Sequence, residues 1–492
     1  MSKSRVFFYC VLAFLLGVAL RSFLNVGSTQ AFFIALFSLI IVAVFYENKK
    51  VLVFSLVAIF LAFGIWRTDK KIELRTDTND SGKIIEQEAK VVSIPVSKNG
   101  FDQIVLEFEN PNIHAIANIG QYSDIFYGDT VDIKCTLQIP KNLPVDDVGK
   151  ESSFDYRMYL AKDGIGYICN KPIIKKISSA GKFDFFSTLT KIKKYFENKL
   201  YSQIPQPEGA LAGGLIFGGG SNLSDEMQKS FSRTGTTHII AVSGYNVTIV
   251  AEYFLLFGIA LGMWRRQAIW FAIVGIILFV IMVGMPASAV RAGVMGGVVL
   301  WALKNGRLAS STNAIMLAGA IMLFLNPLLL RWDIGFQLSF LATIGVVICS
   351  GLWQKSKFSK MQFGGLTEIV VLTLGAQIFV WPIIAYNFQS FSVISLLANI
   401  MVLPIIPFSM LLVFLVAMSG FFLPYVSFIF AWIAYIPLRY ETFIIRFLGS
   451  VSWASVEVKN MSAYYLVIYY IILTGTIIAL KKYQSASWRK KI

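Results

Sequence analysis

Long apolar runs recur along most of the chain and are separated by short polar loops. Many of these runs approach the roughly 20 residues that a helix needs to cross the hydrocarbon core of a membrane. We therefore expect about twelve membrane spans and a polytopic α-helical membrane protein. The predicted spans cover residues 6–23, 30–46, 50–66, 236–264, 267–284, 286–303, 311–327, 335–353, 367–386, 392–419, 424–447 and 462–480.

Residues 69–180 have a different pattern, in which apolar and polar positions alternate over short segments. The segments with this alternation are Ile84–Ile94, Gln103–Phe108, Ile113–Ile119 and Thr130–Ile139. Strict alternation is typical of strands with one buried face. About five short strands in a stretch of this length predict a small barrel, and we expect an OB-like one.

These changes of pattern divide the chain into five regions. Residues 181–206 form an amphipathic helix, in which Phe185, Leu189 and Ile192 alternate with lysines, and such a helix usually lies at the membrane interface. The regions are N-terminal transmembrane helices at 1–68, an exported β-rich domain at 69–180, the interfacial helix at 181–206, a second transmembrane region at 207–482 and a basic cytoplasmic tail at 483–492.

Composition agrees with a membrane protein. The chain is 56% hydrophobic and only 15% charged, whereas soluble chains contain about 25% charged residues. The first span follows Lys3 and Arg5 like a signal peptide, but it has no small-x-small cleavage site and further spans follow. We therefore expect it to be retained in the mature protein.

The net charge of +16 could indicate an anionic partner, or it could reflect the excess of lysine and arginine in cytoplasmic loops. The second explanation is favoured. With the N-terminus in the cytoplasm, the loops on that side contain Lys49, Lys50, Arg265, Arg266, Lys304, Arg307, Lys355, Lys357 and Lys360, and the tail begins at Lys481. The opposite loops hold little beyond Arg331 and Lys459. We therefore expect an inner-membrane protein with both termini in the cytoplasm and residues 69–180 exported. One miscounted span would reverse that domain's side.

The cysteines and histidines limit the chemistry. Cys135 and Cys169 both lie in the exported domain, where the environment is oxidising, so we predict a disulfide between them. Closing this loop would stabilise the domain by about 3 kcal/mol. Cys10 and Cys349 lie in spans and no CxxC motif occurs, so a zinc or redox centre is not expected. Two histidines cannot build a histidine-rich di-metal hydrolase site, and no cofactor is predicted.

Polar groups inside membrane spans cost free energy, so those that are present usually have a structural or functional role. The densest cluster is the segment 234–247, TGTTHIIAVSGYNV, which contains His238, Ser243 and Asn246. Gly235 and Gly244 weaken helix there, so we expect a broken or re-entrant segment that lines a cavity. The alternative is hydrogen bonding between neighbouring helices.

Two further clusters follow. In the segment 286–292, PASAVRA, Ser288 and Arg291 share one helical face, and Arg291 either extends to the interface or offers its guanidinium to a phosphate. In the segment 326–340, Asp333 stands at a helix N-cap position, and Gln337 and Ser339 continue into the span. Asn399 marks another polar point further along the chain.

In order and spacing, the three clusters resemble the motifs TGxxHxxAxSGxxV, SxxRA and DxGFQLSF of the ComEC family of DNA-internalisation proteins. The segment 154–161, FDYRMYLA, resembles that family's FDYxxYL motif. Asn246 stands where many relatives have histidine, so a proton-carrying role is not expected at that position. Larger members continue into a metallo-β-lactamase-like domain. This chain stops at Ile492 without an HxHxDH run, so we expect no nuclease or other enzyme activity in it.

The resemblance implies a channel that imports single-stranded DNA across the bacterial inner membrane during natural transformation. Its partners would be membrane lipid, a surface DNA receptor, a cytoplasmic translocation motor and a separate nuclease. Basic residues would attract the phosphates, and aromatic residues would offer faces for base stacking. The residues expected along the DNA path are His238, Ser243, Asn246, Ser288, Arg291, Asp333, Gln337, Ser339 and Asn399.

Two other functions remain open at this point. Broken helices also serve transporters of other anionic or lipid-linked solutes, although no clear internal repeat supports this alternative. An intramembrane hydrolase would need Ser243 and His238 to act together. Five residues of an ideal helix place these side chains about 140° apart, and no acid is paired with them, so this reading is disfavoured.

Overall fold

The computed structural model describes residues 3–76, 81–98, 101–110, 112–120, 124–140, 155–179, 185–219, 223–304, 311–354, 366–458 and 461–489. Phe154 of the fourth motif and the basic residues Arg307, Lys355, Lys357, Lys360 and Lys459 lie outside these ranges. The chain divides into two compact units, Met1–Lys194 with Arg307–Gln337, and Tyr195–Gly306 with Leu338–Ile492.

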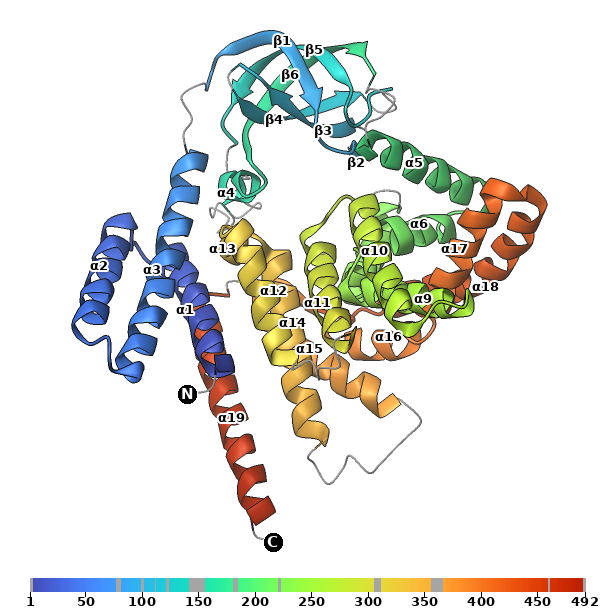
Figure 1. The fold of residues 1–492 in the computed structure, drawn as a ribbon. Coiled ribbons are helices and arrows are strands. Elements are labelled where there is room, and N and C mark those ends of the chain that lie inside the picture. Colours follow the sequence, from blue (N-terminus) through green and yellow to red (C-terminus); the bar gives the residue numbers. More distant parts are fainter. Residues whose placement is uncertain are drawn as a thin grey trace. The chain divides into compact units, whose positions relative to one another are not determined.

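The first unit combines helices with a β-sheet (Figure 1). Its helices are α1 (Lys3–Phe23), α2 (Ser28–Val44), α3 (Lys49–Thr76), α4 (Tyr156–Ala161), α12 (Ser311–Leu325) and α13 (Leu329–Trp332). Gly17 on α1 and Gly64 on α3 let these two helices pack closely, because a Cβ at Gly17 would lie 2.1 Å from the carbonyl oxygen of Leu61. At one end of the pair, Arg21 forms a 2.6 Å ion pair with Asp69.

The sheet is six-stranded and closes on itself. Its strands are β1 (Ile84–Val91), β2 (Val96–Lys98), β3 (Phe101–Phe108), β4 (Ile113–Gly120), β5 (Thr130–Gln138) and β6 (Ile165–Ser178). The order is β1-β5-β6-β4-β3-β2, and an additional β1–β3 pairing completes a barrel. The β4–β6 pair is parallel, whereas the other pairs are antiparallel.

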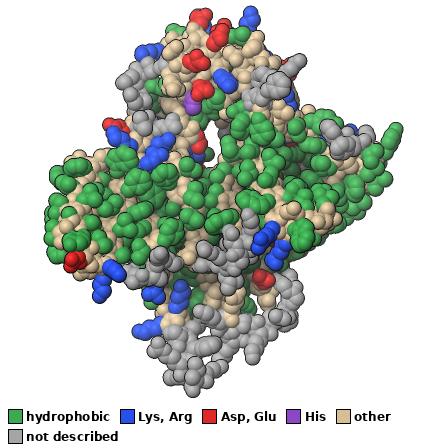
Figure 2. All heavy atoms as spheres, viewed as in Figure 1, with side chains coloured by type: hydrophobic (Ala, Val, Ile, Leu, Met, Phe, Trp, Pro, Cys, Tyr) green, Lys and Arg blue, Asp and Glu red, His purple; other side chains and the backbone are tan. Residues whose placement is uncertain are grey.

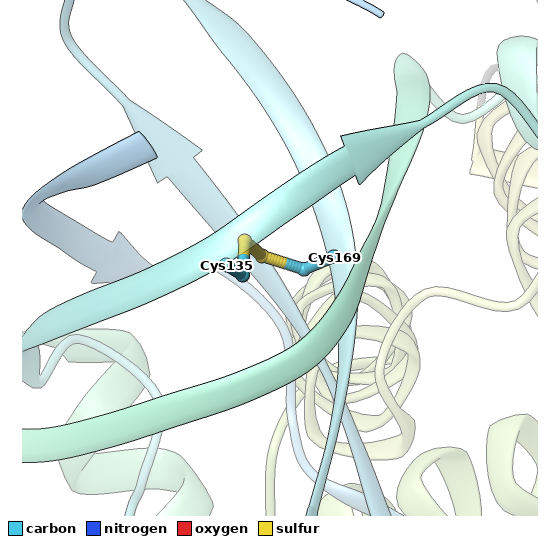
Figure 3. Close-up of a disulfide and its surroundings, with 2 residues drawn as sticks. All are labelled: Cys135 and Cys169. Carbon is cyan, nitrogen blue, oxygen red and sulfur yellow. A yellow bond between two sulfur atoms is a disulfide. The ribbon is translucent and has the colours of Figure 1, made fainter. Parts of the chain in front are cut away.

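The barrel interior is filled by the apolar positions of the alternating strands. Val91, Leu106, Phe108 and Val131 are fully buried in this core. Cys135 on β5 and Cys169 on β6 are bonded as a disulfide with their Cα atoms 5.5 Å apart, as Figure 3 shows. The bond therefore links two neighbouring strands at the edge of the apolar core.

The second unit is helical, with a short two-stranded sheet of β7 (Ser390–Ser392) and β8 (Ser455–Glu457). Helix α5 (Phe185–Gln203) runs from the first unit into it. The helices that follow are α6 (Glu208–Phe217), α7 (Asp225–Arg233), α8 (Thr237–Ile240), α9 (Gly244–Ala260), α10 (Arg265–Val283), α11 (Ala287–Lys304), α14 (Ile334–Gln354), α15 (Leu366–Phe388), α16 (Ser395–Val402), α17 (Ile406–Phe422), α18 (Pro424–Ser450) and α19 (Ala463–Arg489). Its main core joins residues of α6, α16, α17 and α18, among them Leu211, Val402, Val413 and Leu438.

Each of the predicted spans coincides with at least one apolar helix, but their number is not confirmed. Within the described residues, seven helices are long and apolar enough to cross a membrane, and the bent pair α16 and α17 would make eight. Helices α2, α9, α11 and α12 are shorter than a typical span. Helix α9 is shorter than predicted because the chain breaks between Ile240 and Gly244.

The outer surfaces of the helices are apolar. Trp432 is 64% exposed, Phe443 60% and Tyr464 68%, which would be costly for side chains that face water. Figure 2 shows hydrophobic side chains over most of the visible helical surface, whereas charged side chains lie on the barrel and at the edges of the helical surface. These surfaces fit a polytopic membrane protein whose helices face lipid.

Candidate functional site

The first motif begins as a tight turn at the end of α7. The Thr234 hydroxyl donates to the Ser230 carbonyl at 2.8 Å and lies 2.7 Å from the Thr236 hydroxyl. Gly235 has a φ of +68°, a conformation that side chains disfavour, and a Cβ there would lie 2.8 Å from Cβ of Ser395. Glycine is therefore required at this position both by the backbone and by the contact with α16.

His238 lies on the exposed side of the short helix α8. Its Nδ1 is 3.1 Å from the carbonyl oxygen of Gly235, so the imidazole is held by its own turn. The break that follows, from Ala241 to Ser243, separates α8 from α9. The interruption that the glycines predict is thus present in the structure.

Ser243 and Asn246 join the start of α9 to α6. The Ser243 hydroxyl donates to Asn246 Oδ1 at 3.0 Å, and Asn246 Nδ2 donates to the carbonyl oxygen of Leu215 at 3.1 Å. Asn246 is only 1% exposed. These hydrogen bonds satisfy the side-chain amide of Asn246 inside the protein. They correspond to hydrogen bonding between helices, the alternative to pore lining that the sequence left open.

The second motif contacts the first. The Ser288 hydroxyl donates to the carbonyl oxygen of Val242, in the break before α9, at 2.7 Å. One turn later, the Cβ of Ala292 would lie 3.7 Å from a Cβ at Gly244. Two motifs far apart in the sequence therefore meet at the helix break.

Arg291 is enclosed by protein. It is 1% exposed, and its guanidinium carbon lies 5.5 Å from the centre of the Phe340 ring on α14. A cation over an aromatic face is an attractive contact, and it links the second motif to the end of the third.

The earlier part of the third motif lies in the first unit. Asp333 Oδ1 accepts a 2.8 Å hydrogen bond from the Phe336 amide, so Asp333 caps α14 as its position predicts. Gln337 Nε2 donates to the carbonyl oxygens of Leu330 at 2.9 Å and Arg331 at 3.0 Å. Gln337 therefore satisfies the last carbonyls of α13.

Asp333 also faces Lys162, the residue that follows α4. Lys162 Nζ lies 3.5 Å from Asp333 Oδ2 and 2.7 Å from Asp163 Oδ2, and it is 4.4 Å from the centre of the Tyr159 ring. Burial disfavours the charge of Lys162, but the carboxylates of Asp163 and Asp333 outweigh it and raise the lysine's pKa above its ordinary value. The carbonyl oxygen of Lys162 accepts a 2.8 Å bond from Asn326.

Asn399 and Ser339 occupy other places in the second unit. Asn399 lies on the buried face of α16, one turn after Ser395, and is 6% exposed. Ser395 accepts a 2.8 Å bond from Gln377 Nε2, so α15, α16 and the turn at Gly235 contact one another. Ser339 is partly buried on α14, and its carbonyl oxygen accepts a 2.8 Å bond from Thr343.

The structure thus brings some of the predicted residues together and leaves others apart. Ser243, Asn246, Ser288 and Arg291 belong to one connected group around the helix break. Asp333 and Gln337 belong to the first unit, and Asn399 lies on α16, one turn after Ser395, which accepts the bond from Gln377. Sequence reasoning missed two buried acids in the second unit, Glu208 and Glu441, although a single acidic residue within an apolar stretch was a usable signal.

Within the described residues, no group of three histidine, cysteine, aspartate or glutamate side chains could hold a metal ion. The absence of nuclease or metal chemistry remains a prediction, since it rests on the sequence.

The comparisons with known proteins agree with these motifs. The chain is similar to ComE operon protein 3 of Bacillus subtilis (strain 168), with 23% identity over 367 residues. The aligned part covers 73% of this chain and 44% of that protein, so the chain spans less than half the length of this relative. No solved structure matches the chain. The model of the competence protein family matches residues 215–483, which is more than half of the sequence and includes all three motifs, and the chain therefore belongs to the competence protein family.

Proposed function

We propose that this protein acts in DNA uptake for natural transformation and forms the path by which a single strand crosses the inner membrane. The observation that carries the proposal is the contact among the family's motifs inside the second unit. Ser288 bonds to Val242 at 2.7 Å, and Arg291 lies over Phe340. Polar side chains that lie between apolar helices can line a path for phosphates.

The state described here is closed around these residues, because Arg291 and Asn246 are each 1% exposed. A strand would need a continuous polar path, since lipid offers nothing to replace the water around its phosphates. We infer that the path opens between α9, α11 and α14, where the motifs meet. Opening would expose Arg291, whose planar guanidinium suits a phosphate.

The remaining parts are assigned by the same proposal. Residues 69–180 form an exported OB-like barrel, for which the closed strand order and the parallel β4–β6 pair are the support. Residues 181–206 lie at the membrane interface, with Phe185 and Tyr195 about half exposed on α5. Both termini face the cytoplasm, in keeping with the basic loops.

The partners proposed with this function are single-stranded DNA, membrane lipid, a surface DNA receptor, a cytoplasmic motor and a separate nuclease. A strand that is drawn inward needs a source of force, and a duplex needs an activity that removes the other strand. The net charge of +16 is compatible with an anionic substrate but is already explained by the basic cytoplasmic loops.

Deleting the gene tests the proposal. We expect labelled DNA to bind the cell surface normally while its entry into the cytoplasm is lost, and a plasmid copy of the gene should restore entry. Unchanged entry in the deletion strain would refute DNA import. Loss of uptake of a different anionic or lipid-linked solute, with normal DNA entry, would support the alternative transporter.

A further inference from the structure

Glu441 is an acidic residue in the apolar core of the second unit. It is fully buried on α18, on the face that also holds Ala434, Leu438 and Ile445. These residues recur at helical spacing and pack against α16 and α17. An ionisable side chain within such a core is costly to keep and therefore indicates a function.

The carboxyl group of Glu441 has a hydroxyl beside it. The Ser409 hydroxyl lies 2.5 Å from Glu441 Oε1, and it also lies 3.3 Å from the carbonyl oxygen of Ile405. Within the described residues, Glu441 Oε2 has no hydrogen-bond partner. Ile405 is the residue just before α17, at the break where α16 and α17 are bent by 52°.

The elements packed along α18 bring no cation to this carboxyl group. Helices α16 and α17 contain no titratable side chain. On α6, Glu208 accepts 2.9 Å bonds from Arg439 and Thr442, and on α7, Arg233 donates to the Val451 carbonyl oxygen at 2.6 Å. The other charged side chains of α7 and α18 are exposed, namely Asp225, Glu226, Lys229 and Arg446.

A bare carboxylate in this setting would be far more costly than a neutral acid, because burial removes its water and one hydroxyl cannot replace it. A neutral acid is readily accommodated here. Its Oε1 hydroxyl can donate to Ser409, whose own hydrogen then turns to the Ile405 carbonyl oxygen.

We propose that Glu441 and Ser409 form a proton-binding site that couples strand import to proton movement across the membrane, an inference that rests on the proposed function. When the proton leaves Glu441, the Ser409 hydroxyl turns back and donates to the carboxylate. That rotation removes one of two hydrogen bonds from the Ile405 carbonyl at the helix break, which keeps its 3.0 Å bond from the Ser409 amide. Proton binding and the α16–α17 bend are thus linked through one hydroxyl group.

Chemical labelling tests the site without DNA. N,N′-dicyclohexylcarbodiimide is a lipophilic reagent that modifies protonated carboxyl groups, and mass spectrometry of the full-length protein in liposomes would locate the product. We expect labelling of Glu441 that falls as the pH is raised. The water-exposed Glu226 should stay unlabelled. Absence of labelling at Glu441, or labelling that does not change with pH, would overturn the proposal.

Import by variants tests the coupling. Glu441→Gln keeps the shape of the neutral acid but cannot release a proton, so DNA entry should fall by about ten-fold or more at normal membrane levels. Glu441→Asp retains a titratable group and should keep part of the activity. Glu226→Gln is the matched control and should import normally.

The outcomes separate this inference from the proposed function. If the deletion strain loses DNA entry but Glu441→Gln imports at the normal rate, the coupling is refuted and the import function stands. If the deletion strain imports DNA normally, the import function fails, and labelling still decides whether Glu441 binds a proton.

Discussion

Lys162 and Asp333 form a buried ion pair, with 3.5 Å between Nζ and Oδ2, and their side chains are only 7% and 10% exposed. Lys162 follows α4, whereas Asp333 caps α14. Met158, Ala161 and Leu328 of the same unit pack together in an apolar cluster. The aspartate of the third motif therefore joins the segment after α4 to the start of α14.

Removing the lysine should weaken this joint. Lys162→Met leaves a buried carboxylate without its cation, and we expect a loss of about 3 kcal/mol in the free energy of unfolding. Lys134→Met is the control, because its pair with Glu86 is 52% and 63% exposed and should contribute about 1 kcal/mol or less. Thermal unfolding of the purified protein measures both changes, and equal small shifts would contradict the role of Lys162.

The same pair predicts a pH dependence. The pKa of Lys162 is raised above its ordinary value of 10.5, so its contribution to stability is complete at neutral pH. That contribution is lost only as the pH rises through the raised pKa of the folded state. Wild-type protein should therefore lose more stability than Lys162→Met between neutral and strongly alkaline pH, as thermal unfolding would show. Parallel curves for the two proteins would argue against the charged pair.

The disulfide makes a prediction about the stability of the barrel. Replacing both Cys135 and Cys169 by serine should lower the barrel's stability by about 3 kcal/mol, since the bond closes a loop with a sequence separation of 34. Protease sensitivity of the barrel in intact membranes measures the change. Cys10→Ser, which alters a cysteine outside the bond, should leave it unchanged. Cys10 and Cys349 are free thiols in either case, so alkylation located at Cys135 or Cys169 before reduction would show that the bond does not form in the cell.

Local patterns predicted most of the barrel but not its last strand. The alternating segments coincide with β1, β3, β4 and β5. Strand β6 contains Asn170, Lys171 and Pro172, residues that favour turns, and Lys171 has a φ of +49°. The strand passes through this bend because it pairs with both β4 and β5. Such pairing joins distant segments, so a reading of neighbouring residues does not reveal it.

The sequence predicted which residues belong to the candidate site but not how these residues contact one another. The glycines of the first motif indicated the helix break, and Ser288 and Arg291 were expected on one face. That Ser288 bonds to Val242 and that Arg291 lies over Phe340 depends on how α9, α11 and α14 pack. Glu441 was not predicted, because its burial depends on how α18 packs against α16 and α17.

Substituting Gly235 should lower stability, and the same substitution at Gly262 is a matched control. Gly235→Ala forces a side chain into a left-handed backbone and places its Cβ 2.8 Å from that of Ser395, so stability and import should both fall. Gly262→Ala has the same backbone problem, with a φ of +80°, but nothing lies within 4 Å. We expect about 1 kcal/mol for Gly262→Ala and clearly more for Gly235→Ala in thermal unfolding. Equal losses would mean that the contact with α16 does not matter.

A substitution at Arg291 tests whether the buried motif residues around the helix break serve import or only folding. Arg291→Lys keeps a positive charge but loses the planar group that lies over Phe340, so we expect normal membrane insertion with DNA entry reduced by about ten-fold. Arg446→Ala removes an exposed arginine from α18 and should import normally. Membrane levels and cytoplasmic entry of labelled DNA are measured in the same cells. Normal import by Arg291→Lys would remove the planar guanidinium from the DNA path. Loss of the protein from the membrane would assign Arg291 to packing alone.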